Sequence, residues 1–214
     1  MLVAPSILAA DFLNLGRDIG MLNASADLVH LDVMDGTLVP NISFGFPVIE
    51  AVKDMVTIPM DAHLMVVHPE RWFETCAGLG VQYLSFHYEA AGRRTASFIS
   101  KIQSLGMKAG IAIDPDVPVE KLFPYIGKAD FFLIMSVFAG FGGQKFIEET
   151  YERISTLKAE ISRRGAASLI EVDGGVGVSN AENLRKCGVD IAVSGSAVFK
   201  APDPAGYIAA IRVA

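Results

Sequence analysis

The stretch LVHLDVMDG, residues 28–36, decides the fold of this chain. It is a short apolar run with β-branched residues that ends in polar residues and a glycine, and this pattern predicts a strand. Successive side chains of a strand point to opposite faces, so His30, Asp32 and Met34 share one face while Leu31 and Val33 share the other. The apolar face suits packing against a layer of helices, which leaves the polar face pointing the opposite way.

Short apolar runs of the same kind recur from one end of the chain to the other, and longer segments with helical spacing of apolar residues lie between them. The eight predicted strands are 3–8, 28–34, 60–65, 83–87, 108–113, 131–137, 169–173 and 191–194, and the clearest helical segments are 69–79, 95–105, 119–125, 151–164 and 178–187. Strict alternation of strand and helix predicts a parallel sheet, and eight repeats close most naturally into a barrel. We therefore predict an α/β fold, a (β/α)8 TIM barrel, with residues 1–214 as one catalytic domain.

The composition limits the classes of partner. The net charge is −6 without blocks of like sign, which argues against nucleic acid or an anionic membrane surface as the main partner. No stretch of 18 apolar residues occurs, and the apolar start of the chain lacks the basic residues of a signal peptide. Cys76 and Cys187 have no Cys or His neighbour and suit a reducing compartment. We expect a cytoplasmic protein.

The polar residues at strand ends indicate chemistry, because active sites of TIM barrels lie at the carboxyl ends of the strands. His30 and Asp32 lie on the second strand, His63 on the third, and Asp173 ends the seventh. Buried carboxylates are costly unless a cation or hydrogen bonds compensate them, so one divalent metal ion is expected, with hydrogen-bonded barrel residues as the alternative. Nitrogen and oxygen ligands suit Zn, Fe, Mn or Co.

Methionines accompany these residues and are expected either to wall the reacting centre or to fill the core. They are Met34, Met65 and Met135. His87 and Glu89 share a face with Ser85 on the fourth strand, and we expect them to hydrogen bond in the core or behind the site rather than to react.

Three glycine-rich strand ends late in the chain predict a phosphate site. They are AGFGGQKF (139–146), DGGVGVSN (173–180) and SGSAVF (194–199). Glycines allow backbone N–H groups to approach an anion, and the loops after strands seven and eight of a TIM barrel often bind phosphate.

Together these segments resemble the ribulose-phosphate 3-epimerase family. The matching motifs are APSILAADF (4–12), HLDVMDG (30–36), VPNISFG (39–45), AHLMV (62–66), GFGGQKF (140–146), EVDGG (171–175) and GSAVF (195–199). The resemblance implies a metal ion held by His30, Asp32, His63 and Asp173, with Asp32 and Asp173 as the catalytic acid/base pair. It implies substrate contacts from Ser6, His63, Gly140, Phe141, Gly142, Gly143, Asp173, Gly174, Gly175, Gly195 and Ser196.

The implied reaction is epimerisation at C3 of a phosphorylated ketose, most simply D-ribulose 5-phosphate to D-xylulose 5-phosphate. One aspartate removes the C3 proton, the metal stabilises the enediolate, and the other aspartate returns a proton to the opposite face. No redox cofactor is required. The resemblance also implies a homo-oligomer, either a dimer or a hexamer.

The chain departs from the family pattern around the sugar. Phe138–Ala139 replace a Glu-Pro pair, Thr37–Leu38 replace a basic or His residue followed by Phe, and Asp114 and Val117 stand where Asn and Thr are usual. None of these departures affects a candidate metal ligand. The resemblance therefore predicts the type of reaction more directly than the identity of the sugar. Allulose-6-phosphate 3-epimerase is the nearest alternative.

Two other classes of function fit the sequence less well. The orotidylate decarboxylase and hexulose-phosphate synthase group would place an Asp-x-Lys-x-x-Asp pattern at a strand end, but HLDVMD has no lysine. A phosphosugar-binding protein without catalysis would not need two aspartates beside two histidines.

Overall fold

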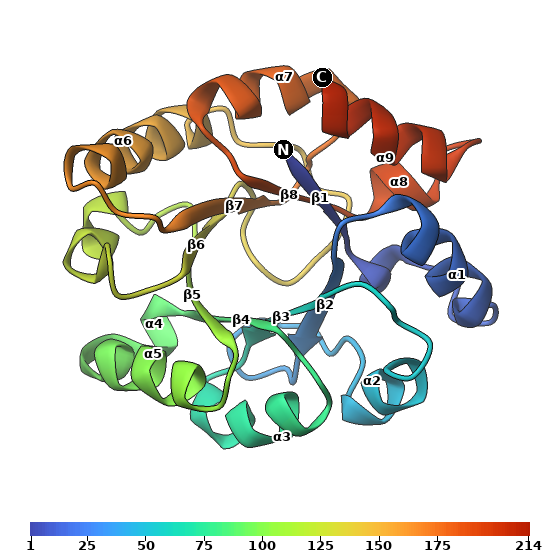
Figure 1. The fold of residues 1–214 in the computed structure, drawn as a ribbon, viewed down its shortest axis with the longest axis horizontal. Helices are drawn as coiled ribbons and strands as arrows, with labels where there is room; N and C mark the ends of the chain where they lie inside the picture. Colours follow the sequence, from blue (N-terminus) through green and yellow to red (C-terminus); the bar gives the residue numbers. More distant parts are fainter.

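The computed structural model describes residues 1–214 and places eight parallel strands in a ring, with helices around the outside (Figure 1). The strands run in the order β1-β8-β7-β6-β5-β4-β3-β2, and a parallel bridge between Ser6 and His30 joins the two ends of this order. They are β1 (Leu2–Pro5), β2 (Val29–Met34), β3 (Met60–Met65), β4 (Tyr83–His87), β5 (Lys108–Ile113), β6 (Phe131–Met135), β7 (Leu169–Asp173) and β8 (Ile191–Ser194). The predicted TIM barrel is confirmed.

Helices form the crossovers that parallel strands require. The α-helices are α1 (Leu15–Ser25), α2 (Phe46–Val52), α3 (Phe73–Gly78), α4 (Tyr88–Ala91), α5 (Thr95–Ser104), α6 (Thr150–Arg163), α7 (Val178–Cys187), α8 (Ser196–Phe199) and α9 (Pro204–Val213). Short 3-10 helices occur at Ile7–Ala9, Pro69–Arg71, Gly92–Arg94 and Val119–Tyr125. None of the helices has the length and apolar character that crossing a bilayer demands.

The core lies mainly between the strands and the helices. Leu31 and Val33, on the outer face of β2, belong to one continuous cluster of 48 buried apolar residues that includes Phe98 and Ile102 of α5. The inner face of β2 carries His30 and Asp32 instead, and both are buried. The alternation expected for β2 is therefore present, and it directs the polar side chains to the axis of the barrel.

The ends or types of several elements differ from the sequence prediction, and at two strands side-chain hydrogen bonds are the reason. The first strand stops at Pro5, since the Ser6 hydroxyl accepts the N–H of Leu8 and starts a 3-10 turn. The sixth strand stops at Met135, where the next residue, Ser136, donates its hydroxyl to the carbonyls of Asp173, which ends β7, and of Gly174. Residues 119–125 form a 3-10 helix rather than an α-helix, with Pro124 inside it. The predicted helix 69–79 divides at Trp72 into a 3-10 turn and α3.

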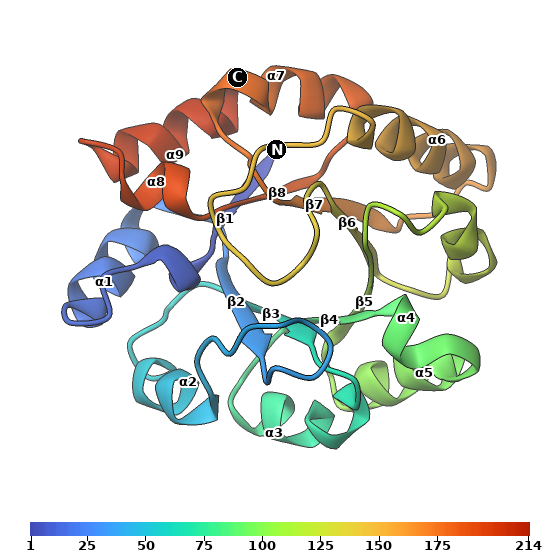
Figure 2. The ribbon, with the colours of Figure 1, turned by 180° about the vertical axis from the view of Figure 1, so that it is seen from behind.

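The long loop between β6 and α6 covers one end of the barrel. Figure 2 shows this loop, drawn in yellow, extending across the centre of the ring of strands. The carboxyl ends of all eight strands meet beneath it, because the strands are parallel. Polar residues at those ends therefore face a space that the loop partly encloses.

Candidate active site

Four side chains from three strands converge at the carboxyl end of the barrel. His30 and Asp32 come from β2, His63 from β3 and Asp173 from β7. His30 Nε2 lies 3.4 Å from Asp32 Oδ1, and His63 Nδ1 lies 3.5 Å from the same oxygen. One ligand atom from each of the four residues lies within 4.8 Å of the others. The residues predicted to share one site are therefore close enough to do so.

Three polar atoms of this cluster lack hydrogen-bond partners, and this favours a bound metal ion. His30 Nε2, Asp32 Oδ1 and His63 Nδ1 are buried and have no hydrogen-bond partner. Unpartnered buried polar atoms are costly, and three of them at one place call for a group that accepts all three lone pairs. Imidazole nitrogen combined with carboxylate oxygen is the donor set that Zn, Fe, Mn and Co accept.

A second layer of carboxylates lies behind His30. His30 Nδ1 is 2.6 Å from Asp61 Oδ2 on β3 and 3.8 Å from Glu171 Oε1 on β7. A carboxylate only accepts when it is ionised, so Asp61 holds a proton on Nδ1 and directs Nε2 at the site, where it can bind a cation once the ring is neutral. The sequence offered a signal for both acids, since each lies two residues before a candidate ligand on the same strand face.

Burial and neighbouring charges separate the pKa values of the four groups. Burial raises the pKa of Asp32, but the positive charge of the nearby His30 outweighs it and holds that pKa well below the usual value. Burial and then the charge of Asp32 raise the pKa of Asp173 to about 7. Burial lowers the pKa of His63 to about 4, whereas the pKa of His30 rises well above 6.5 because Asp61 and Asp32 outweigh its burial. Of the two aspartates, only Asp173 is near half-protonation at neutral pH.

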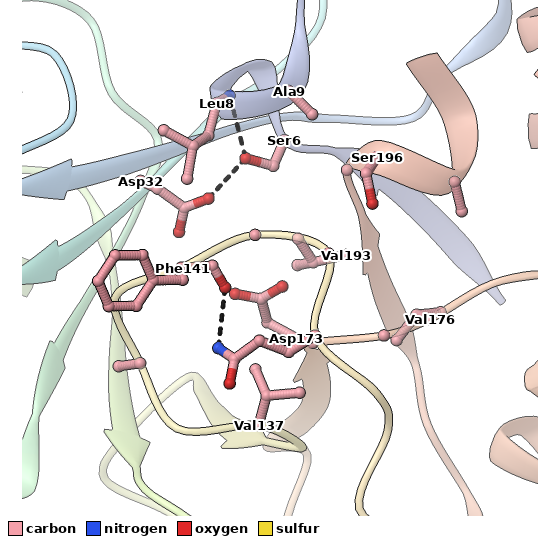
Figure 3. A pocket seen from close by; sticks show the side chains of 18 of the residues that line it. Ser6, Leu8, Ala9, Asp32, Val137, Phe141, Asp173, Val176, Val193 and Ser196 are labelled. Atoms are coloured by element: carbon pink, nitrogen blue, oxygen red, sulfur yellow. Dashed lines mark hydrogen bonds between the residues drawn. The ribbon is translucent and has the colours of Figure 1, made fainter. Parts of the chain in front are cut away.

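A cavity of ≈ 540 Å³ opens above this cluster. Figure 3 shows the carboxylates of Asp32 and Asp173 pointing into it from different sides, and Ser6 donates its hydroxyl to Asp32 Oδ2 at 2.5 Å. The predicted site residues that line the cavity are Ser6, Asp32, Met34, Met65, Met135, Gly140, Phe141, Gly142, Gly143, Asp173, Gly174, Gly175, Gly195 and Ser196. His30 and His63 are fully buried and do not line it. The predicted substrate contact of His63 is thus not seen at the cavity wall.

The loop after β6 is held over the cavity by side chains. Asn41 Nδ2 donates to the carbonyl of Gly140 at 2.7 Å and joins the loop after β2 to the loop after β6. Gln144 Nε2 donates to the carbonyls of Phe138 and Phe141 from within the loop. Gly143 has a φ of 75°, which favours glycine, and an added Cβ there would lie 3.6 Å from Ser196 Oγ.

Phe138 and Ala139, which the sequence analysis places around the sugar, also line the cavity. The other lining residues were missed by sequence reasoning. They are Leu8, Ala9, Asn41, Val137, Gln144, Val176, Gly177, Ser179, Val193, Ala197, Lys200 and Tyr207. Lys200 is the one basic side chain in the cavity wall, and it follows the predicted phosphate motif GSAVF directly. A basic residue directly after such a motif was the signal that the sequence offered. Tyr207 lies on α9, far from any motif.

A TIM barrel with a histidine–aspartate cluster beneath a cavity at the carboxyl ends of its strands defines this protein as a barrel enzyme. Residues 2–199 match the model of the ribulose-phosphate 3 epimerase family. Ribulose-phosphate 3-epimerase of Mycobacterium bovis is 41% identical, over 99% of this chain and 91% of the relative, and that of Bacillus subtilis is 40% identical, over 98% and 97%. The chain belongs to this family of isomerases.

Solved structures with low sequence identity share the fold. A 3-hexulose-6-phosphate synthase aligns with a TM-score of 0.72 at 17% identity, covering 100% of this chain and 99% of the other. A mutant tryptophan synthase α-subunit from Pyrococcus furiosus aligns with a TM-score of 0.72 at 14% identity, covering 99% and 96%. These similarities confirm the barrel architecture.

Proposed function

We propose that this protein interconverts D-ribulose 5-phosphate and D-xylulose 5-phosphate by moving protons at C3, with Asp32 and Asp173 as the acid/base pair. The observation that carries the proposal is that two aspartates with different pKa values, about 7 for Asp173, point their carboxylates into one cavity. An acid/base group works best when its pKa is close to the working pH. The names of the family relatives support the same substrate.

The proposed site includes one divalent metal ion held by His30, Asp32, His63 and Asp173. The unpartnered atoms of His30, Asp32 and His63, with a carboxylate oxygen of Asp173 close to them, support this assignment. A bound divalent cation supplies Lewis-acid stabilisation of the negative charge that develops when a proton leaves carbon next to a carbonyl. Asp61 orients His30 toward the ion, and the chain's remaining contribution is to exclude water and place the sugar.

Proton transfer on two faces of the sugar requires groups on two sides of the bound substrate. Asp32 extends from β2 and Asp173 from β7, and their carboxylates enter the cavity from different sides (Figure 3). One aspartate removes the C3 proton, and the protonated form of the other delivers a proton to the opposite face. Ser6 holds the carboxylate of Asp32 in place through its hydroxyl. Met34, Met65 and Met135 line the cavity near these acids and keep its wall apolar.

The phosphate of the substrate is proposed to bind at the glycine-rich turns in the cavity wall. Gly174, Gly175, Gly195 and Ser196 line the cavity, and Lys200 adds the only basic side chain. Backbone N–H groups of glycine-rich turns bind phosphate oxygens, and a nearby ammonium group adds charge attraction. Binding energy from the phosphate, remote from C3, orients the sugar between the two aspartates.

The proposed reaction is tested by incubating the Mn²⁺- or Co²⁺-loaded protein with D-ribulose 5-phosphate in D₂O. We expect xylulose 5-phosphate with deuterium at C3, and no turnover after EDTA dialysis. Allulose 6-phosphate in a parallel reaction tests the alternative sugar, because Phe138 and Ala139 form part of the cavity wall. Product without deuterium, or faster exchange in allulose 6-phosphate, would contradict the proposed mechanism or the proposed substrate, respectively.

The role of Asp173 leads to a direct prediction. Asp173→Asn keeps the shape of the side chain but removes its ability to accept a proton, so we expect kcat to fall by about 10²- to 10⁴-fold. The matched control is Asp116→Asn, which removes a carboxylate from an exposed position in the loop after β5. Steady-state kinetics compares the two variants. Half of the wild-type kcat in Asp173→Asn would remove this residue from the mechanism.

A further inference from the structure

His87, at the end of β4, extends the cluster beyond the four candidate ligands. Its Nε2 atom lies 2.9 Å from Nε2 of His63, and the two ring planes are 19° apart. Both side chains are fully buried. Two ring nitrogens at this distance in a dry environment share a single proton, because two lone pairs would repel and two N–H groups would clash.

Carboxylates lie at both ends of this histidine pair. His63 Nδ1 is 3.5 Å from Asp32 Oδ1, and His87 Nδ1 is 3.8 Å from Glu89 Oε2. Neither Nδ1 atom has a hydrogen-bond partner. Glu89 is fixed from its other side, since its Oε1 accepts the backbone N–H of Asp114 at 3.0 Å. The arrangement is a row of four side chains, in the order Asp32, His63, His87 and Glu89.

Counting protons along the row shows what His87 does. Two neutral imidazoles carry two protons, and one of them lies between the two Nε2 atoms. The second proton then lies either on His63 Nδ1, facing Asp32, or on His87 Nδ1, facing Glu89. Only the second arrangement leaves the His63 Nδ1 lone pair free to bind a cation, and Glu89 favours it because a carboxylate accepts the His87 proton.

We propose that His87, backed by Glu89, is a positioning residue that keeps His63 in the Nε2–H tautomer and so presents Nδ1 to the metal ion. This inference rests on the metal site of the proposed function. His87 itself touches neither the cavity nor the four-residue cluster except through His63. Replacing His87 is therefore expected to change the metal affinity and the tautomer of His63. Any change in turnover should follow from these two effects.

The test measures Co²⁺ affinity by competition with a chelator in four variants. We expect His87→Phe, which keeps a ring but accepts no hydrogen bond, to weaken Co²⁺ binding by about 10- to 100-fold. His87→Gln can accept the His63 proton through its Oε1 atom, so affinity should return to within about threefold of wild type. Glu89→Ala removes the acceptor at the far end and should weaken binding by about three- to tenfold. Ser85→Ala is the control, because Ser85 is a fully buried residue two positions earlier on β4 whose hydroxyl has no hydrogen-bond partner.

A second measurement separates positioning from packing. Nitrogen-15 NMR of the histidine rings in Zn²⁺-loaded protein should show His63 protonated at Nε2 and His87 at Nδ1, and the metal-free Glu89→Ala variant should gain the Nδ1–H form of His63. Wild-type affinity in both His87→Phe and Glu89→Ala, or a His63 that is protonated at Nδ1 in the loaded protein, would overturn the proposal. Equal weakening in His87→Phe, His87→Gln and Ser85→Ala would assign only packing and would overturn it as well. Wild-type protein that binds neither Co²⁺ nor Zn²⁺ would overturn the metal site itself.

Discussion

Asp32 and Asp173 are the same residue type at the ends of two strands, yet their surroundings give them opposite pKa shifts. Asp32 lies beside two imidazoles and accepts the Ser6 hydroxyl, so its ionised form is favoured. Asp173 is half-buried, and its desolvation and the negative charge of Asp32 favour the protonated form. Two carboxyl groups whose environments separate their pKa values can serve as an acid and a base at the same pH.

These shifts predict how metal uptake depends on pH. Because the pKa of Asp173 is raised from 3.8 to about 7, this group holds a proton below pH 7 in metal-free protein and must release it on binding a metal. His63, with a pKa lowered to about 4, is already neutral above pH 5 and releases none. Between pH 5 and 7, Asp173 should therefore contribute about a tenfold gain in affinity per pH unit, and its contribution should end above pH 7, where His30, with its raised pKa, still has a proton to release.

Calorimetry of Co²⁺ binding at pH 6, in two buffers with different ionisation enthalpies, counts the released protons. We expect Asp173→Asn to release about one proton fewer than wild type. His63→Ala, in contrast, should bind more weakly with an unchanged proton count, because the wild-type imidazole is neutral at this pH. An equal proton count in Asp173→Asn and wild type would show that Asp173 is ionised before the metal arrives.

At the scale of elements, the loop after β6 depends on residues of other loops for its position. Asp114, directly after β5, accepts the N–H of Ala139 through Oδ1 at 3.2 Å. Arg153 of α6 donates to the carbonyl of Asp114 at 2.8 Å and fixes it in turn. Since Ala139 lies where the loop leaves β6, these contacts set the direction in which the loop crosses the cavity.

The loop geometry predicts a difference between two substitutions at Asp114. Asp114→Ala removes the acceptor for Ala139, and a hydrogen bond of about 0.5–1.5 kcal/mol corresponds to a rise in KM of about two- to tenfold, with a smaller change in kcat. Asp114→Asn retains an oxygen acceptor and should keep a KM close to wild type. Steady-state kinetics with the phosphorylated ketose makes the comparison, and a wild-type KM in Asp114→Ala would show that the loop is positioned without this contact.

The sequence predicted the elements well where periodicity alone determines them. Strands β3, β4, β5, β7 and β8 have the predicted bounds, because each is a short segment with a Gly, Pro or polar residue at one end or both. The ends of β1 and β6 were predicted too late in the chain. Ser6 and Ser136 end these strands through side-chain hydrogen bonds, and the apolar residues that follow them gave no sign of this.

At the scale of the whole molecule, the parallel topology predicted that the site residues lie together, but it did not predict the individual contacts between their side chains. Parallel strands bring their carboxyl ends together, so Asp32 and Asp173 could be placed at one site although 141 positions separate them. The pairing of His63 with His87 depends on strand register, which aligns His63 with Ser85 and places His87 two residues further along β4. Lys200 and Tyr207 reach the cavity through the path of α8 and α9, which sequence periodicity does not specify.

The buried cluster also joins β2, β3 and β7, so a bound metal ion should stabilise the whole barrel. A ligand that binds only the folded state adds about 2.7 kcal/mol at one hundred times its Kd. For a chain of this length, each kcal/mol raises Tm by about 2–4 °C, so saturating Co²⁺ or Zn²⁺ should raise Tm of EDTA-treated protein by about 5–10 °C. Differential scanning calorimetry measures the shift, and His63→Ala, which lacks one of the four candidate ligands, should show a markedly smaller one. Equal shifts in His63→Ala and wild type would mean that the stabilising ion binds elsewhere, and an unchanged Tm in wild type with Co, Zn, Mn and Fe would contradict a metal site at the centre of the barrel.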